Sequence, residues 1–289
     1  MNRLYKGIDI SKWQGKVDFK AVKDSGVQFV MLRTGFGRFK GQEDPLFLEN
    51  YKKAKTAGLF VGAYHYSYAK TPQEAKEEAA LCLSLLKGLT FSFPIAFDME
   101  ERTVAELGKE KVSAIAKSFC DTLEQAGYYV CIYASKSWLE NSFTEEIFKK
   151  YDIWLAHWAS ETNFQKPFGL WQYTSDGEVD GIGGRVDLDR AYKPYPEIMR
   201  KNGLNGFPKD TPKPPTPDFS AGTAVVLKNT PLYVSATAQK PTAKKTGTFY
   251  LYDGEKISGR YRVTNSAKRV GKRPGGTNVT GYVNATDLR

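Results

Sequence analysis

The sequence predicts an α/β barrel followed by a small all-β unit. Eight strand-like segments lie within roughly the first 200 residues of a 289-residue chain, and helical patterns fill the gaps between the early ones. A proline-rich stretch separates this part from a basic segment of short strands and turns. Eight strands with helices chiefly between the early ones favour a closed, irregular β/α barrel over an open sheet.

The expected strands of the barrel are short and largely apolar runs. They cover residues 5–10, 29–34, 59–68, 94–100, 130–134, 153–157, 169–173 and 186–191. A short helix is expected at residues 19–25. Helical content is expected to fade after residue 150, so that the last three strands follow with little between them.

Three longer helices carry start and stop signals. They are expected at residues 45–57, 72–87 and 109–126, each followed by a glycine. Asp44 and Pro45 supply an N-cap and a first-turn proline for the first of them. Thr71 and Glu74 form a capping box for the second.

Charge and proline content divide the chain into three parts. Residues 1–206 carry 28 Lys and Arg against 27 Asp and Glu, whereas residues 220–289 carry 12 against 3. Between them, residues 207–219 hold five of the 14 prolines, which indicates a semi-rigid linker. The basic part favours a polyanionic partner, which would be nucleic acid, acidic lipid or an anionic cell-wall polymer.

Short strands with turn signals predict a small all-β barrel or sandwich in the basic part. The strands are expected at residues 224–228, 232–235, 248–252, 260–264 and 279–284. Asp253-Gly254 and Pro274-Gly275-Gly276 are the expected turns.

The cysteines and the first residues of the chain indicate the cellular compartment in which the protein folds. Cys82, Cys120 and Cys131 form no even framework and are expected to be buried and reduced, which predicts folding in a reducing cytoplasm. Residues 1–6 show no signal-peptide pattern, and no apolar run approaches the ~20 residues needed to span a bilayer. We therefore expect a protein made in the cytoplasm that does not insert into a membrane.

Two acids follow a buried strand in the middle of the barrel sequence. Residues 93–97 are apolar, and Asp98 and Glu100 come next. In an extended strand these two side chains share a face, with α-carbons about 7 Å apart. That spacing suits two carboxyl groups acting on one scissile bond. The alternative is a strand that exits into a charged turn, since Glu101 and Arg102 follow.

Polar and aromatic residues recur where the other expected strands end. They are Asp9, Arg33, Tyr64, His65, Tyr133, Trp171, Gln172 and Asp187. Because the working groups of β/α barrels lie at the C-terminal ends of strands, we expect one pocket here. We assign the non-acidic members to substrate binding, with His65 as a hydrogen-bonding residue rather than a base. For Trp154 and Trp158, packing and sugar contact are equally open.

The four expected pocket acids are Asp9, Asp98, Glu100 and Asp187. Acids gathered in one pocket repel one another, which raises the proton affinity of at least one. We expect Glu100 to be the general acid toward the leaving oxygen of a glycosidic bond, with Asp98 charged beside an oxocarbenium ion. Asp9 and Asp187 would tune the pair or, alternatively, cap strand ends. The spacing leaves retaining, inverting and substrate-assisted outcomes open.

No metal or cofactor is expected. His65 and His157 are the only histidines of the sequence, and no ligand spacing joins them. The glycine-rich segments at residues 35–41 and 181–184 lack the spacing of a dinucleotide loop and are expected to be turns. There is no Gly-x-Ser-x-Gly elbow and no phosphate loop.

Five separated motifs give the first part of the chain a family likeness. They are Asp9-Ile10-Ser11 with Trp13-Gln14-Gly15, Gly62-Ala63-Tyr64-His65-Tyr66, Phe97-Asp98-Met99-Glu100, Leu170-Trp171-Gln172-Tyr173 and Val186-Asp187-Leu188-Asp189. Over roughly residues 4–200 the chain resembles glycoside hydrolase family 25, lysozymes common among phage endolysins and bacterial autolysins. The resemblance implies a TIM-like (β/α)5(β)3 barrel with Glu100 as acid/base. It also implies cleavage of the β-1,4 bond between N-acetylmuramic acid and N-acetylglucosamine in peptidoglycan.

The basic part resembles a bacterial SH3-like wall-binding module. The likeness lies in Leu251-Tyr252-Asp253-Gly254, in residues 259–264 and in Gly281-Tyr282-Val283. It implies an anchor that holds the enzyme on peptidoglycan and on an anionic wall polymer. A phage endolysin, made in the host cytoplasm and released through a membrane lesion, fits the absence of a signal pattern.

Two other functions are compatible with the sequence. A degenerate barrel without activity would leave a non-catalytic cell-wall-binding protein. The charge of the basic part also permits nucleic-acid binding, but no recognised motif supports it, and we expect no nucleic-acid partner. The sequence indicates no oligomeric state.

Overall fold

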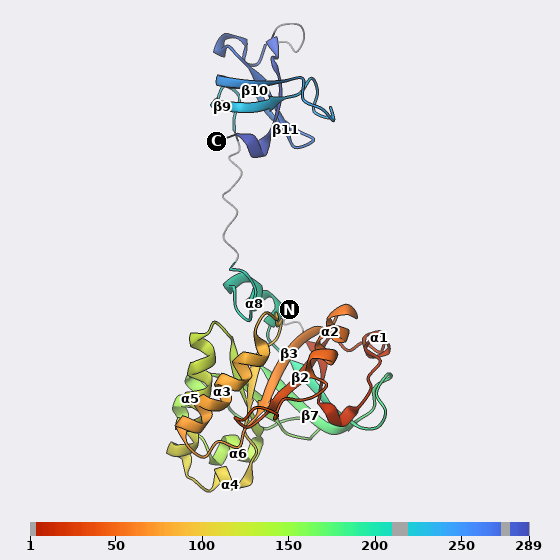
Figure 1. The fold of residues 1–289 in the computed structure, drawn as a ribbon, viewed down its shortest axis with the longest axis vertical. Helices are drawn as coiled ribbons and strands as arrows, with labels where there is room; N and C mark the ends of the chain where they lie inside the picture. Colours follow the sequence, from red (N-terminus) through yellow and green to blue (C-terminus); the bar gives the residue numbers. More distant parts are fainter. Residues whose placement is uncertain (1–3, 210–218, 273–277, 289) are drawn as a thin grey trace. The chain divides into compact units, whose positions relative to one another are not determined.

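The computed structural model describes residues 4–209, 219–272 and 278–288 (Figure 1). Contacts between residues divide the chain into two compact units, Met1–Asp210 and Thr211–Arg289. Each unit has a hydrophobic core of its own. None of the described helices is long and apolar enough to cross a membrane.

The first unit contains a closed barrel of eight strands, which confirms the α/β barrel predicted from the sequence. The strands are β1 (Tyr5–Ile10), β2 (Phe29–Phe36), β3 (Phe60–Tyr66), β4 (Ile95–Asp98), β5 (Val130–Ser135), β6 (Asp152–Ala156), β7 (Leu170–Gly177) and β8 (Val186–Ala191). Neighbours from β1 to β7 pair in parallel, whereas β8 pairs antiparallel with both β7 and β1. The start of β8 therefore lies at the same end of the barrel as the C-terminal ends of the other strands.

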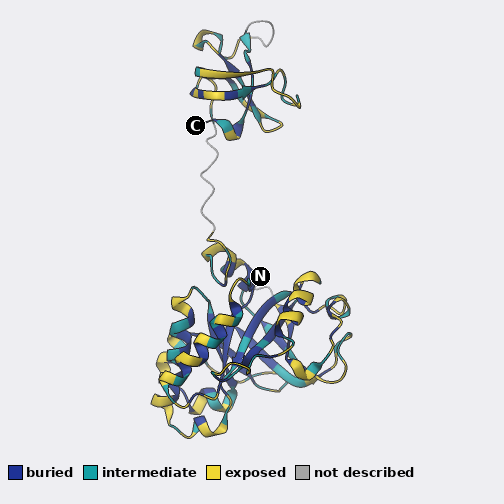
Figure 2. Cartoon of the chain, viewed as in Figure 1, coloured by how far each residue is buried: buried dark blue, intermediate teal, exposed yellow. Residues whose placement is uncertain are grey.

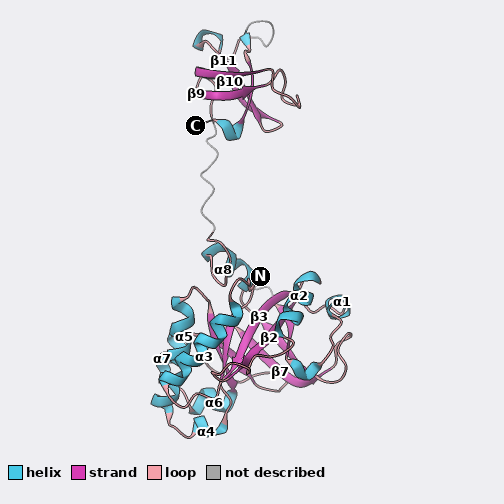
Figure 3. Cartoon of the chain, in the orientation of Figure 1, coloured by secondary structure: helices cyan, strands magenta, loops and turns pink. Residues whose placement is uncertain are grey.

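Helices connect the first six strands and cover the outside of the barrel (Figure 3). They are α1 (Phe19–Asp24), α2 (Phe47–Thr56), α3 (Pro72–Leu86), α4 (Arg102–Ala105), α5 (Lys109–Gln125), α6 (Lys136–Asn141) and α7 (Glu145–Lys150), with a 3-10 turn η1 (Lys12–Gln14) after β1. Residues 157–185, all described, link β6, β7 and β8 without a helix. One helix, α8 (Tyr195–Asn202), follows β8, so helical structure continues beyond the point expected from the sequence.

The start of α2 differs from the prediction. The helix begins at Phe47 and has no side-chain cap. Asp44, the expected cap, accepts the backbone N–H of Leu46 through Oδ1, and its Oδ2 accepts the backbone N–H of Lys12 and the guanidinium of Arg33. The carboxyl group of Asp44 therefore makes a local contact just before α2 and tertiary contacts as well.

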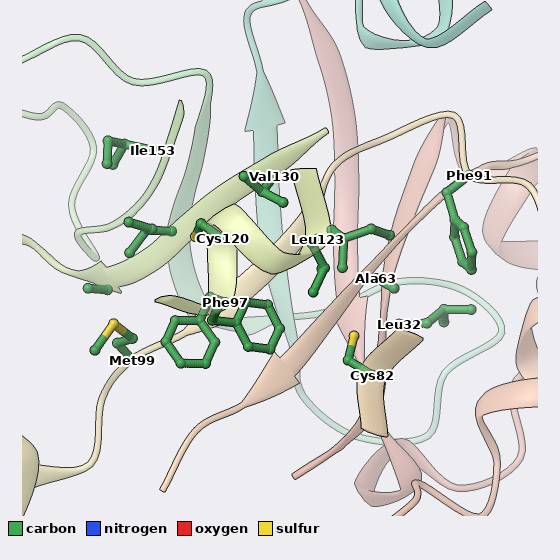
Figure 4. Packing of buried hydrophobic residues seen from close by; sticks show 14 of the residues in the cluster. Leu32, Ala63, Cys82, Phe91, Phe97, Met99, Cys120, Leu123, Val130 and Ile153 are labelled. Carbon is green, nitrogen blue, oxygen red and sulfur yellow. The ribbon is translucent and has the colours of Figure 1, made fainter. Parts of the chain in front are cut away.

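Two apolar layers lie on either side of the barrel strands. In the layer between strands and helices, Phe97 of β4 stacks on Phe119 of α5 with ring centroids 4.0 Å apart; Figure 4 shows the surroundings of Phe97. Inside the barrel, Phe29 and Phe93 stack at 4.2 Å, and Tyr195 of α8 packs on Phe93. The strands are buried on both faces, and the outer faces of the helices are exposed (Figure 2). All three cysteines are free and buried, as expected: Cys82, Cys120 and Cys131.

The second unit is a four-stranded antiparallel sheet. Its strands are β9 (Ala224–Leu232), β10 (Ala243–Ile257), β11 (Arg260–Thr264) and β12 (Gly281–Asn284), with 3-10 turns η2 (Ala267–Arg269) and η4 (Ala285–Asp287). Asp253-Gly254 is not the expected turn, because it lies within β10 where the pairing with β11 shifts register. The hairpin turns at Ser258 and Gly259, both with positive φ, as a two-residue loop requires. The expected turn at Pro274-Gly275-Gly276 lies outside the described residues.

Candidate active site

A pocket of about 410 Å³ opens at the end of the barrel where the parallel strands have their C-termini. It is lined by Asp9, Ser11, Trp13, Gln14, Arg33, Tyr64, Tyr66, Asp98, Glu100, Tyr133, Trp154, Trp158, Gln172, Ser175 and Asp187. All four acids singled out in the sequence are among these residues. The fold also brings four of the expected substrate contacts to the pocket, namely Arg33, Tyr64, Tyr133 and Gln172.

β4 brings Asp98 to the pocket and ends there. Glu100 lies in the loop before α4, so the two acids do not share a strand face as the sequence argument assumed. Both nevertheless line the pocket: Glu100 is exposed, and Asp98 is only 4% exposed. The Oδ1 atom of Asp98 is buried and has no hydrogen-bond partner among the described residues. The pair therefore combines an accessible acid with a buried one that has an unused acceptor.

A hydrogen-bond network fixes the orientation of Asp9. Trp158 Nε1 and Tyr133 Oη each lie 3.0 Å from Gln172 Oε1, and Gln172 Nε2 donates to Asp9 Oδ2 at 2.8 Å. An indole N–H can only donate, so the amide oxygen must face Trp158 and the amide nitrogen must face Asp9. Asp9 is therefore the acceptor in this contact.

Asp187 reaches the pocket from the start of β8 rather than from a C-terminal strand end. The antiparallel direction of β8 places its first residues at the pocket, with Asp187 directly opposite Asp9 in register. Two positions further along, Asp189 is 1% exposed and does not line the pocket. Its Oδ1 accepts a hydrogen bond of 2.8 Å from Trp154 Nε1. The rule that site residues lie at the C-terminal ends of barrel strands therefore does not apply to β8.

Burial raises the pKa of the five carboxyl groups described above, those of Asp9, Asp98, Glu100, Asp187 and Asp189. For Asp98 the charge of Glu100 adds to the effect of burial, and Arg33 opposes it. For Glu100 the enclosing pocket walls are the main cause of the raised pKa, followed by the charges of Asp187 and Glu101. Crowding by other acids, which the sequence suggested as the cause, comes second. The pKa of Asp98, which we expected to be charged, is raised as well as that of Glu100.

Arg33 is the one Lys or Arg in the lining of the pocket among the described residues. Its Nε and Nη2 atoms lie 2.9 and 2.8 Å from Asp44 Oδ2. Asp44 is buried and also accepts the backbone N–H of Lys12. The ion pair holds the guanidinium at the pocket wall, where its charge lowers the pKa of Asp98.

Two residues expected to bind substrate do not line the pocket. Trp171 lies in the layer between the barrel and the helices, and His65 is fully buried against the ring of Phe119 in α5. Each is one position away from an inward-facing residue, Gln172 or Tyr64. Because successive side chains of a strand alternate, the neighbours of pocket residues point outward.

Two exposed tryptophans line the pocket: Trp13 was not among the expected site residues, and for Trp158 the sequence left packing and sugar contact equally open. Trp13 in η1 is 75% exposed and Trp158 is 63% exposed, and both line the pocket. Each follows a strand end, β1 or β6, which is the signal that pointed to the other site residues. Trp154 is 1% exposed, so packing and the hydrogen bond to Asp189 account for it.

A second hollow of about 540 Å³ adjoins the acid pocket. It shares Glu100, Tyr133 and Trp158 with the acid pocket, and its other lining residues include Lys136 and His157. Glu100 therefore lies where the two hollows meet, so a polymer lying across both would have one of its bonds beside this carboxyl group. Within the described residues, no group of three or more His, Cys, Asp or Glu has the arrangement of a metal site.

Comparison with protein families gives one match that covers most of the first unit. The model of glycosyl hydrolases family 25 matches residues 8–182. The autolytic lysozyme of Clostridium acetobutylicum is 34% identical over 187 residues, which are 64% of this chain and 55% of that protein.

Two solved structures resemble the first unit. The autolysin LytC from Streptococcus pneumoniae, in complex with a synthetic peptidoglycan ligand, matches with a TM-score of 0.60 and 29% identity over 66% of this chain and 47% of that chain. The catalytic domain of the endolysin ply40, from bacteriophage P40 of Listeria monocytogenes, matches with a TM-score of 0.55 and 25% identity over 69% and 98%. The match spans about half the length of the Clostridium and Streptococcus proteins.

Proposed function

The chain belongs to glycosyl hydrolases family 25, and on this basis we propose that it is a lysozyme. Its reaction would be hydrolysis of the β-1,4 bond between N-acetylmuramic acid and N-acetylglucosamine in peptidoglycan. The observation that carries the proposal is the pocket in which Asp98 and Glu100 meet Asp9 and Asp187. The similarity to an autolytic lysozyme, and to an autolysin solved with a peptidoglycan ligand, supports the same substrate.

Glu100 acts as the general acid in this proposal. A glycan chain lying across the two hollows would place the leaving oxygen of one bond at Glu100, between the acid pocket and the neighbouring hollow. The raised pKa favours the protonated form of this carboxyl group, which transfer of a proton to the leaving oxygen requires. The sugar that develops oxocarbenium character would then lie in the acid pocket, beside Asp98.

Asp98 fits the task of orienting an N-acetyl group. Its buried Oδ1 has no described partner, and the N–H of a substrate acetamido group would supply the missing donor. That hydrogen bond would stabilise the charged form of Asp98 and leave the proton of the pair on Glu100. The acetamido oxygen could then attack the anomeric carbon, which retains its configuration. Proton NMR of the first-formed anomer tests this course, and an inverted product would rule it out.

The bond that is cut can be identified directly. Purified walls digested with the protein should yield new reducing ends of N-acetylmuramic acid. New reducing ends of N-acetylglucosamine, or new free amino groups, would assign the activity to another bond. Walls that stay intact would favour the alternative of a non-catalytic wall-binding protein.

For the second unit we propose a role as an SH3-like anchor. In this division residues 1–206 form the catalytic domain, residues 207–219 the linker and residues 220–289 the wall-binding domain. The net charge of +9 favours an anionic wall polymer, and the unit exposes lysines for which no ion pair is described. They include Lys228, Lys240, Lys244 and Lys245.

A sedimentation assay with the full chain tests the anchor. Binding to purified walls should weaken when anionic polymers are extracted from the walls, and when Lys244 and Lys245 are both replaced by Glu. The matched control replaces two exposed lysines of the first unit, Lys52 and Lys111, by Glu. Equal effects of the two charge changes would argue against a wall-binding role of the second unit.

We further propose that the protein is a phage endolysin, made in the host cytoplasm and released through a membrane lesion. The similarity to a bacteriophage endolysin supports this assignment. Expression in a susceptible bacterium should leave the cells intact until the membrane is permeabilised by a separate agent. Lysis that begins without permeabilisation would contradict it.

A further inference from the structure

Asp189 is a buried carboxyl group to which the proposed reaction assigns no task. It lies on β8, two positions beyond Asp187 and on the same face of the strand. Its Oδ1 accepts the N–H of Trp154, a residue of the pocket lining. Its Oδ2 is buried as well and has no hydrogen-bond partner among the described residues. A carboxylate with one oxygen in this state would carry a large desolvation cost.

Asp9 is the neighbour of Asp189 across the β1–β8 pair. Asp9 lies opposite Asp187, so Asp189 occupies the diagonal position on the same face, and the two carboxyl groups interact. None of the ion pairs formed by the described residues includes either of them, and Arg33 is bound to Asp44. Two buried carboxyl groups without a cation cannot both stay charged, so the pair holds a proton.

Each carboxyl group accepts one N–H, so the surroundings of the other oxygen decide which member keeps the charge. Asp9 lines the pocket, whereas Asp189 does not. Asp9 receives the N–H of Gln172, whose orientation is fixed by Trp158. Asp189 Oδ2 receives no donor from any described residue. A proton on this oxygen would satisfy it and would turn it into a donor toward Asp9.

We infer that Asp189 is a positioning residue that carries a proton on Oδ2 and donates it in a hydrogen bond to Asp9. Asp9 then keeps its charge and a single orientation at the pocket, with Gln172 donating to it as well. Only the catalytic consequence rests on the proposed function, because the proton on Asp189 does not depend on what the pocket binds.

Burial and neighbouring charges raise the pKa of both carboxyl groups, so it is the geometry that places the proton on Asp189. Burial, followed by the charge of Asp187, raises the pKa of Asp189 to about 8, and the N–H of Trp154 opposes the rise. Burial and the charges of Asp189 and Asp187 on β8 and of Asp98 on β4 raise the pKa of Asp9, and the N–H of Gln172 lowers it. Neutral donors face the pair from β6 and β7, through Trp154 and Gln172.

Carbon-13 NMR of the intact chain, labelled at the aspartate carboxyl carbons, tests the location of the proton without any substrate. We expect one carboxyl signal with a titration midpoint near pH 8, which is missing from Asp189→Asn and present in the control Asp24→Asn. Asp24 lies on the surface, paired with Lys20. The inference is overturned if Asp189→Asn removes a signal that is already fully charged at pH 6.

A second variant, which retains Asp189, tests whether the signal near pH 8 belongs to this residue. Trp154→Phe removes the one donor to Oδ1, which destabilises the charged form, so the midpoint near pH 8 should move upward. A midpoint that stays unchanged in Trp154→Phe would show that the signal does not belong to Asp189 and would overturn the inference.

Kinetics on a soluble peptidoglycan fragment test the positioning role. The amide of Asp189→Asn can donate the same hydrogen bond to Asp9, so most of the kcat should remain, whereas Asp189→Ala should lower kcat about tenfold. Equal losses in the two variants, with the NMR result as expected, would leave the proton in place but overturn the positioning role. If the wild-type protein does not cut this substrate, the proposed function fails and the NMR result still stands.

Discussion

Gln172 on β7 donates a hydrogen bond of 2.8 Å to Asp9 on β1, across 163 positions of the sequence. The two strands are not neighbours, because β8 lies between them in the barrel. The same side chain accepts hydrogen bonds from Tyr133 and Trp158. One amide group thus ties an acid of the pocket to two of its aromatic walls.

Replacing Gln172 by Leu should therefore weaken catalysis more than it alters the fold. The change leaves Asp9 and the donors of Tyr133 and Trp158 without their partner, and we expect kcat/KM to fall about tenfold to a hundredfold. The assay uses a soluble peptidoglycan fragment, with circular dichroism as the check on folding. Gln165→Leu, in an exposed loop, is the control; a similar fall there would refute a specific role of Gln172.

Glu100→Gln keeps the size of the side chain and removes the proton that it would donate. We expect kcat to fall about 100- to 10,000-fold, the usual contribution of a general acid. Glu106→Gln is the matched control, because Glu106 is exposed and does not line the pocket. Undiminished wall lysis by Glu100→Gln would show that another group supplies the proton.

The pH dependence of kcat/KM should shift in a predictable direction when Asp187 is replaced. Glu100 must be protonated to act, and the charge of Asp187 helps to raise the pKa of Glu100. Asp187→Asn removes that charge and lowers this pKa, so the alkaline decline of kcat/KM should begin at lower pH. The profile is measured with a soluble fragment, which avoids titration of the wall itself. A decline that stays in place or moves to higher pH would contradict the coupling.

Much of the barrel could be predicted because each strand is an apolar run between turn signals. β1 and β8 have the bounds expected from the sequence, and Thr71 caps α3 with its hydroxyl as predicted. What the sequence does not specify is which face of a strand points inward. These strands are buried on both faces, so inward and outward positions look alike, and Trp171 and Gln172 were equally good candidates.

The remaining differences arise from contacts between distant residues. Asp44 pairs with Arg33 as well as with the backbone N–H of Leu46, and no local pattern could indicate that ion pair. Asp187 reaches the pocket only because β8 runs antiparallel to its neighbours. Glu100 lies beyond the end of β4, so its place in the pocket depends on a loop and not on strand periodicity.

Substitution of Trp158 should weaken substrate binding, whereas substitution of Trp171 should lower the stability of the fold. Trp158 is exposed in the pocket and Trp171 is buried behind the strand, so Trp158→Ala should raise KM about tenfold, a factor that corresponds to ~1.4 kcal/mol. Trp171→Phe removes the hydrogen bond to the carbonyl of His157 and should lower the free energy of unfolding by about 1 kcal/mol with KM unchanged. Steady-state kinetics and urea unfolding give the two quantities. A raised KM in Trp171→Phe would place that ring in the site after all.

His65 should make the first unit sensitive to acid. Its ring is fully buried between Thr34 Oγ1 and the carbonyl of Gly37, and burial lowers its pKa from 6.5 to about 4. Between pH 4 and pH 6.5 the unfolded chain binds more protons at His65 than the native chain does. The contribution of the neutral His65 ring to stability is therefore complete above pH 6.5. It is lost as the pH falls through this range toward 4, by about 3 kcal/mol at most.

The contribution of His65 can be isolated with a variant that does not titrate. His65→Gln keeps a donor for the carbonyl of Gly37 but should be less stable than the wild type at pH 7, because it loses the ring contact with Phe119. The other titrating groups are common to both proteins, so the gap between their free energies of unfolding should narrow from pH 7 to pH 4. Urea unfolding at several pH values measures this gap. A gap that is constant, or that widens toward pH 4, would mean that His65 does not resist protonation in the native state.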